Sequence, residues 1–130
     1  MRKSQPRRRR SSGSEPARAA DPYRGFADDY HWLHPDRAWQ VGTLDRVARR
    51  CLRTLPEGSA VLDASAGIGL DAVWLARQGF RTAACDLSPA MVEAAKSHAG
   101  SEGVDVDVRL ADWRSLSRTF APGSFDAVLC

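Results

Sequence analysis

Residues 61–72 limit the possible folds more than any other part of the chain. They begin with a short apolar run, which is typical of a buried strand. The run passes through Asp63 into a turn that contains Gly67 and Gly69, and from Leu70 onward apolar residues recur at helical spacing. Strand, glycine-rich turn and helix form the first half of a nucleotide-binding βαβ unit. Glycines let a ligand approach the backbone closely, and the helix N-terminus offers free N–H groups.

The carboxylate of Asp63 discriminates between the ligands that such a turn can bind. The pattern Gly67-x-Gly69-x-x-Ala72 also fits the dinucleotide fingerprint, with alanine in the last place. However, a carboxylate before the glycines would repel a pyrophosphate and attract an ammonium group. S-adenosylmethionine carries such a group, so the turn favours this ligand. An ordinary strand–turn–helix connection with Asp63 as a cap is the alternative.

A second acidic residue, Asp86, follows the next predicted strand at 80–85. An acid in this place can accept hydrogen bonds from both ribose hydroxyls of an adenosine. The residues behind it predict a new helix, because Ser88 is a favoured N-cap and Pro89 a favoured first helical residue.

Two further strands are predicted in the second half of the chain. Valine alternates with charged residues over 104–110, which indicates a half-buried strand at a sheet edge. It leads into Asp112 and Trp113. Residues 125–130, which end at Cys130, form a fourth apolar strand.

In this order, the motifs resemble those of the class I S-adenosylmethionine-dependent methyltransferases over about residues 22–130. Residues 61–69 resemble motif I, with Ser65 where the first glycine is common. Residues 86–91 resemble Asp-x-Ser-x-x-Met, and 125–128 resemble Phe-Asp-x-Val. The resemblance implies an α/β, Rossmann-like three-layer αβα sandwich with sheet order 3-2-1-4, cut off after the fourth strand.

The resemblance also implies how S-adenosylmethionine is bound. Asp63 would face its ammonium group, Asp86 its ribose and Asp112 its adenine amino group. The implied cofactor-binding residues are Tyr30, Trp32, Asp63, Ala64, Gly67, Gly69, Asp86, Leu87, Met91, Asp112, Trp113 and Cys130. Leu87 would pack on the adenine. A core role for Met91 and a helix-capping role for Asp112 are the alternatives.

The N-terminal part divides into a tail at 1–20 and a segment at 21–58, ahead of the methyltransferase core at 59–130. The tail is rich in arginine and is predicted to be disordered. A solvated leader, a transit peptide, a polyanion-binding arm and a wrongly chosen start all fit it. The segment at 21–58 is predicted to hold an aromatic lid, or a simply packed element, followed by an amphipathic helix at about 38–55. The apolar side of this helix is predicted to hold Val41, Leu44, Val47, Ala48, Cys51 and Leu52.

Composition excludes several classes of protein. The first 20 residues hold seven basic residues and one acidic residue, so the other 110 carry twelve basic and fifteen acidic ones. This balance predicts no nucleic-acid groove. The cysteines Cys51, Cys85 and Cys130 form no metal or disulfide pattern, which indicates a reducing, cytoplasmic location. No apolar run is long enough to cross a membrane.

The predicted reaction is methyl transfer to a small-molecule acceptor. Around Tyr30 and Trp32, and around Asp112 and Trp113, the sequence looks like glycine and sarcosine N-methyltransferases, which implies an amine acceptor. Two alternatives remain: a non-catalytic S-adenosylmethionine-binding module or fragment, and a nicotinamide-dependent oxidoreductase. Because this family continues beyond the fourth strand, we expect the isolated chain to be incomplete as an enzyme. The sequence does not predict an oligomeric state.

Overall fold

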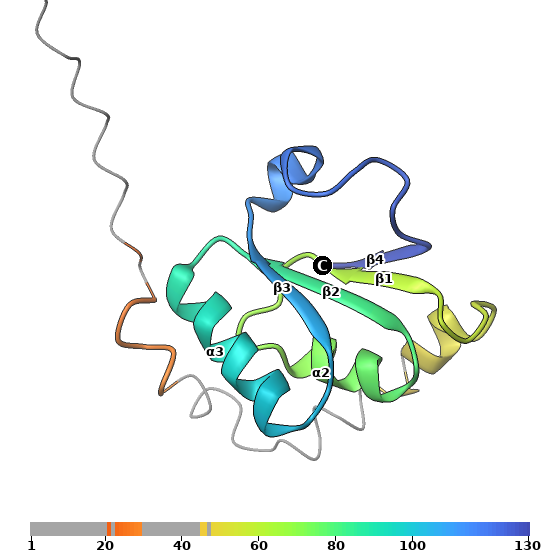
Figure 1. Ribbon diagram of the computed structural model, residues 1–130, viewed down its shortest axis with the longest axis horizontal. Coiled ribbons are helices and arrows are strands. Elements are labelled where there is room, and N and C mark those ends of the chain that lie inside the picture. Colours follow the sequence, from red (N-terminus) through yellow and green to blue (C-terminus); the bar gives the residue numbers. More distant parts are fainter. Residues whose placement is uncertain (1–20, 22, 30–44, 47) are drawn as a thin grey trace, which may run out of the picture.

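The computed structural model describes residues 21, 23–29, 45, 46 and 48–130 (Figure 1). The strands of this part are β1 (Ala60–Asp63), β2 (Arg81–Asp86), β3 (Val106–Leu110) and β4 (Ala127–Leu129). Its helices are α2 (Leu70–Arg77), α3 (Pro89–Ser101) and the 3-10 helix η2 (Trp113–Arg118), preceded by helical residues 45, 46 and 48–52. The predicted tail at 1–20, Tyr30, Trp32 and the start of the predicted helix at 38–55 lie outside the described residues.

The four strands form one parallel sheet in the order β3-β2-β1-β4, which confirms the predicted order. Several strand boundaries differ from the prediction, and β4 is shorter than the predicted 125–130. β3 begins at Val106 rather than at residue 104, because the backbone N–H of Val104 bonds to the Ala99 carbonyl of α3 at 3.1 Å. β2 extends to Asp86, which pairs with Leu110 in the ladder.

The glycine turn packs against α3 as well as against the sheet. Gly69 is the N-cap of α2 and has a left-handed backbone with φ of 83°. A Cβ atom added to Gly69 would lie 3.0 Å from the Cβ of Ala95 on α3. Gly69 therefore allows α2 and α3 to pack closely, a role that the sequence did not predict.

The predicted start of α3 is confirmed. Ser88 is the N-cap, and its hydroxyl accepts a hydrogen bond from the Met91 N–H at 3.2 Å, while Pro89 is the first helical residue. This fixes the point at which the chain leaves β2, next to Asp86.

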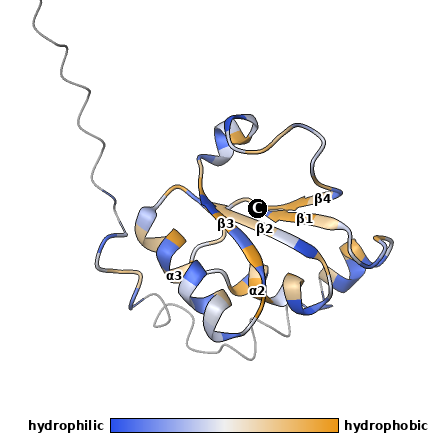
Figure 2. Ribbon diagram, in the orientation of Figure 1, coloured by the Kyte–Doolittle hydropathy of each residue, from blue (hydrophilic) through white to orange (hydrophobic). Residues whose placement is uncertain are grey.

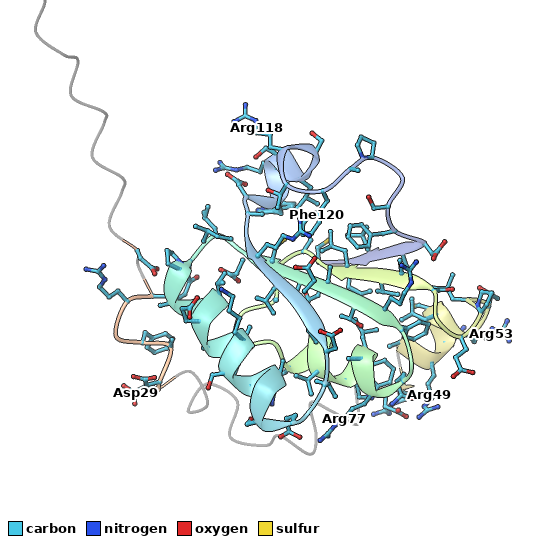
Figure 3. All side chains as sticks on the ribbon, viewed as in Figure 1. Asp29, Arg49, Arg53, Arg77, Arg118 and Phe120 are labelled. Atoms are coloured by element: carbon cyan, nitrogen blue, oxygen red, sulfur yellow. The ribbon has the colours of Figure 1, made fainter. Side chains whose placement is uncertain are left out.

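The two faces of the sheet are covered differently. One face is covered by α2, α3 and the helical residues 45, 46 and 48–52, and there Val61 packs with Leu75 and Leu52. On the other face, Leu62 packs with Phe120, in the loop that follows η2 (Figure 3). The Rossmann-like fold is thus confirmed, with η2 and its loop forming the third layer in the described part. Figure 2 shows that β1, inside the sheet, and β4, at its edge, are mostly hydrophobic.

One packing prediction is wrong. Cys51 was expected on the buried side of the N-terminal helix, but it is exposed. Ala48 and Leu52, one helical turn apart, form the buried stripe, and Cys51 falls beside it.

Candidate functional site

The carboxyl ends of the four parallel strands meet at one edge of the sheet, where ligands bind in open α/β sheets. Backbone hydrogen bonds hold the segments of this edge together. They run from the Ala64 N–H to the Leu129 carbonyl at 2.8 Å, from Ala66 to Cys85 at 2.9 Å and from Ala111 to Asp86 at 3.0 Å. The edge thus brings together the segments that carry most of the predicted site residues.

Asp86 is joined directly to the glycine turn. Its Oδ2 accepts a hydrogen bond from the Gly67 N–H at 2.9 Å, and its Oδ1 accepts one from the Ser88 N–H at 2.9 Å. Gly67 has a positive φ of 53°, which turns its N–H toward this carboxylate. A carboxylate has about four acceptor sites, so Asp86 keeps capacity for the hydroxyl groups of a ribose.

Asp63 is a buried carboxylate that forms no ion pair within the described part of the chain. It is 4% exposed, and its Oδ1 accepts one hydrogen bond, from the Ser65 N–H at 3.3 Å. Burial, together with the negative charges of Asp71 and Asp86, raises the pKa of Asp63 to about 7, although the Ser65 N–H lowers it. Among the described residues no basic side chain forms an ion pair with Asp63. A ligand ammonium group would supply the missing charge.

Exposed apolar side chains flank the two carboxylates. Leu87, directly after β2, and Trp113, after β3, are each 61% exposed. Exposed apolar patches on soluble proteins often mark ligand-binding grooves. The contact of Leu87 and Trp113 with an adenine stays a prediction, and the exposed Cys130 follows β4 at the same edge.

Asp112 makes the helix-capping contact that the sequence analysis gave as the alternative to an adenine contact. It caps η2 by accepting a hydrogen bond from the Arg114 N–H at 2.9 Å, and it pairs with the Arg114 guanidinium at 2.5 Å. The hydrogen bond from the Arg114 side chain lowers the pKa of Asp112 most, and together with the bond from the Arg114 N–H it brings this pKa to about 2. The capping alternative is therefore present, and the adenine contact stays a prediction.

Three other predicted residues are placed as follows. Met91 is 2% exposed, so its side chain belongs to the core, and a cofactor contact stays a prediction. Ala64 is 3% exposed and offers only its backbone, whose carbonyl accepts a hydrogen bond from the Cys85 thiol at 3.5 Å. Gly69 serves the contact with α3 described above.

Two contacts near this edge were missed by the sequence analysis. The Nδ1 atom of His98 on α3 lies 3.2 Å from the Ile68 carbonyl, inside the glycine turn. The carboxylate of Asp21 binds at the start of α3. No sequence signal indicated either contact, because each joins segments far apart in the chain.

Other kinds of site are not indicated. In the part of the chain that the structure describes, no three His, Cys, Asp or Glu side chains are arranged to hold a metal ion. Within the same residues, no helix combines the length and hydropathy needed to cross a membrane.

The chain is similar to known methyltransferases. Residues 61–130 match a family described as a methyltransferase domain. A ubiquinone biosynthesis O-methyltransferase of Xanthomonas euvesicatoria is 37% identical over 77% of this chain and 38% of its own length. The crystal structure of the PH0226 protein of Pyrococcus horikoshii matches with a TM-score of 0.63 and 25% identity, over 77% of this chain and 49% of that one.

A glycine/sarcosine/dimethylglycine N-methyltransferase of Actinopolyspora halophila is 42% identical, over 54% of this chain and 12% of its own length. Several ubiquinone biosynthesis O-methyltransferases match over longer stretches, so the predicted special likeness to glycine and sarcosine enzymes is not confirmed. The chain spans 31–40% of the length of these ubiquinone relatives.

The buried Asp63, the Asp86 carboxylate bound to the glycine turn and the parallel sheet order agree with the family match. The chain belongs to the methyltransferase-domain family, within the class I S-adenosylmethionine-dependent methyltransferases.

Proposed function

We propose that this chain forms the cofactor-binding part of an enzyme that transfers a methyl group from S-adenosylmethionine to a hydroxyl group of a small molecule. The observation that carries the proposal is the pair of carboxylates at the strand ends. Asp63 is buried and has no ion pair with the described residues, and Asp86 is oriented by the Gly67 N–H. Together they fit a ligand that has an ammonium group at one end and a ribose at the other.

Each residue would act by binding and orienting. Asp63 would neutralise the ammonium group, and Asp86 would accept the ribose hydroxyls. The exposed side chains of Leu87 and Trp113 would cover the adenine. S-adenosylmethionine supplies a methyl group on a positively charged sulfur. The contribution of the protein is then alignment of the acceptor with that methyl group and exclusion of water, which lower a barrier by roughly 7–11 kcal/mol in favourable cases.

Binding should also move a proton. Because burial raises the pKa of Asp63 to about 7, a fraction of Asp63 is protonated near neutral pH when no cation is bound. An ammonium group beside it favours the ionised form, so a proton leaves Asp63 when the ligand binds.

The choice of a hydroxyl acceptor follows the ubiquinone biosynthesis O-methyltransferases among the relatives. An amine acceptor, such as glycine or sarcosine, is the second candidate because one N-methyltransferase is 42% identical over 71 residues. The acidic balance of residues 21–130 supports a small molecule rather than a nucleic acid.

The test is transfer of a labelled methyl group by the intact protein to matched panels of hydroxyl and amine acceptors. We expect labelled product with hydroxyl acceptors, and loss of product in Asp86→Ala at a cofactor concentration near the wild-type Kd. Labelling of amines alone would replace the first candidate by the second. Cofactor binding without labelled product in either panel would identify a non-catalytic binding module.

A further inference from the structure

The carboxylate of Asp21 accepts hydrogen bonds from three donors, two of which, Ser88 and Ala90, lie at the start of α3. Its Oδ1 accepts from the Tyr23 N–H at 2.9 Å and from the Ser88 hydroxyl at 2.8 Å. Its Oδ2 accepts from the same hydroxyl at 2.9 Å and from the Ala90 N–H at 3.1 Å. Asp21 and Ser88 are 67 residues apart in the sequence, so this contact fastens the N-terminal segment to the core.

Ser88 connects Asp21 to the candidate site. It is 3% exposed, and its backbone N–H donates to the Asp86 carboxylate at 2.9 Å. Its hydroxyl accepts from the Met91 N–H and donates to Asp21. One buried residue therefore orients the carboxylate of Asp86 with its backbone and is itself oriented by Asp21 through its side chain.

The contact is electrostatically favourable for an ionised Asp21. Desolvation raises the pKa of Asp21, but the hydrogen bonds from Tyr23, Ser88 and Ala90, together with the charge of Arg24, lower it below its ordinary value. A carboxylate at a helix N-terminus is also stabilised by the helix dipole. Figure 1 shows the segment that contains Asp21 beside the first turn of α3.

We propose that Asp21 is a positioning residue of the cofactor site, which acts through Ser88 to hold the Asp86 carboxylate in the orientation that receives the ribose. The proposal rests on the proposed function, because it assumes that Asp86 binds the ribose. It also implies reciprocity: if Asp21 strengthens cofactor binding, bound cofactor strengthens the docking of the N-terminal segment by the same factor.

An asparagine at position 21 breaks the contact while keeping the size of the side chain. Both oxygens of Asp21 accept hydrogen bonds, so the NH₂ group of asparagine would face a donor whichever way the amide turns. Asp29→Asn is the matched control. Asp29 is an exposed residue of the same segment, and its side chain points away from α3 (Figure 3).

The experiment is calorimetric titration of the intact wild-type protein, Asp21→Asn and Asp29→Asn with S-adenosylhomocysteine, well below each melting temperature. We expect Asp21→Asn to bind roughly tenfold more weakly, the size of effect typical of a lost charge-assisted contact, and Asp29→Asn to bind like the wild type. Asp21→Glu keeps two acceptor oxygens and should lose less affinity than Asp21→Asn.

Amide hydrogen exchange supplies a readout that a purely structural contact would not move. We expect S-adenosylhomocysteine to slow exchange at residues 23–29 in the wild type but not in Asp21→Asn. Equal affinity of Asp21→Asn and wild type, or equal losses in the asparagine and glutamate variants, would overturn the proposal and leave the proposed function standing. A folded wild type that does not bind S-adenosylhomocysteine would instead overturn the proposed function, and this proposal with it.

Discussion

The turn after β1 and the connection after β3 stand at the same edge of the sheet, and each begins with an aspartate near the end of its strand. The two carboxylates have opposite surroundings. Asp63 is 4% exposed and has no ion pair among the described residues. Asp112 is paired with Arg114 at 2.5 Å, next to solvent. The glycines differ as well, since Gly69 packs against Ala95, whereas nothing lies within 4 Å of a Cβ added at Gly123.

The difference shows that topology decides where a carboxylate lies but not whether it is available to a ligand. Asp112 already has a cation, so a bound ligand would gain little charge interaction there. Asp63 lacks a cation and pays a desolvation penalty that a ligand ammonium would offset. We therefore expect the turn after β1 to dominate cofactor affinity, with the connection after β3 contributing mainly apolar surface from Trp113.

Between the two connections, the larger effect is expected for Asp63→Asn. Affinity for S-adenosylmethionine should fall by about ten- to a hundredfold, because a buried charge-assisted contact with the ammonium group is lost. The same variant should raise the melting temperature of the unliganded protein at pH 8, because a buried charge has been removed. Calorimetry and thermal melting measure the two effects, with the exposed Asp107→Asn as control. Unchanged affinity in the folded variant would remove Asp63 from the site.

The packing of the two connections can be compared with a pair of glycine substitutions. Gly69→Ala and Gly123→Ala share a left-handed backbone, with φ of 83° and 74°. Only the first introduces a methyl group 3.0 Å from Ala95. We expect Gly123→Ala to lower the free energy of unfolding by about 1 kcal/mol, and Gly69→Ala by roughly 1–3 kcal/mol more. Equal losses in denaturant titrations would mean that α3 moves away from the turn without penalty.

The pH dependence of stability should separate the two aspartates. The pKa of Asp63 is raised to about 7, so the folded state binds a proton more tightly than the unfolded state does. Its contribution to stability is present below pH 4 and is lost as the pH rises toward 7. The pKa of Asp112 is lowered to about 2, so its contribution is present above pH 4 and is lost as the pH falls toward 2.

This linkage can be measured in denaturant titrations of the unliganded protein between pH 4 and pH 8. We expect the decline in stability toward pH 7 to flatten in Asp63→Asn and to persist in Asp112→Asn. A decline of the same steepness in both variants would show that another group causes it.

Much of the fold was predictable because local signals agreed with one another. The apolar run before Asp63, the alternation in 104–110 and the pair Ser88-Pro89 predicted strands and the start of α3. Each of these signals depends on residues that are neighbours in the chain. The sheet order was implied by the resemblance to class I methyltransferases. The edge that gathers Asp63 and Asp86 then followed from the handedness of parallel connections.

The remaining features depend on contacts that a sequence pattern does not encode. Arg114, only two residues from Asp112, donates a hydrogen bond to its carboxylate. The sequence pattern alone left open whether Asp112 binds an adenine or caps a helix. The Gly69–Ala95 contact and the hydrogen bond of Asp21 to Ser88 join segments whose distance in space depends on the finished packing. The roles of Tyr30 and Trp32 as lid residues stay predictions.

The smallest effect is expected for the connection after β3. Asp112→Asn should change the affinity for S-adenosylmethionine by less than about threefold, because a partly exposed carboxylate that is already paired with Arg114 contributes little to binding. Arg114→Ala is the matched variant, since it frees the Asp112 carboxylate without removing it. A loss as large as that of Asp63→Asn would show that Asp112 binds the adenine directly, as the sequence resemblance implies, and would end the distinction between the two connections.

The central claim is that the strand ends of this chain bind S-adenosylmethionine through the carboxylates after β1 and β2. The most direct measurement is calorimetric titration of the intact wild-type protein and of Asp86→Ala with S-adenosylmethionine, with a nicotinamide dinucleotide as the competing ligand. We expect the wild type to bind S-adenosylmethionine and not the dinucleotide. Asp86→Ala should bind about 1–3 kcal/mol more weakly, because the ribose loses a charged acceptor. Equal affinity in a folded Asp86→Ala, or preference of the wild type for the dinucleotide, would contradict the account.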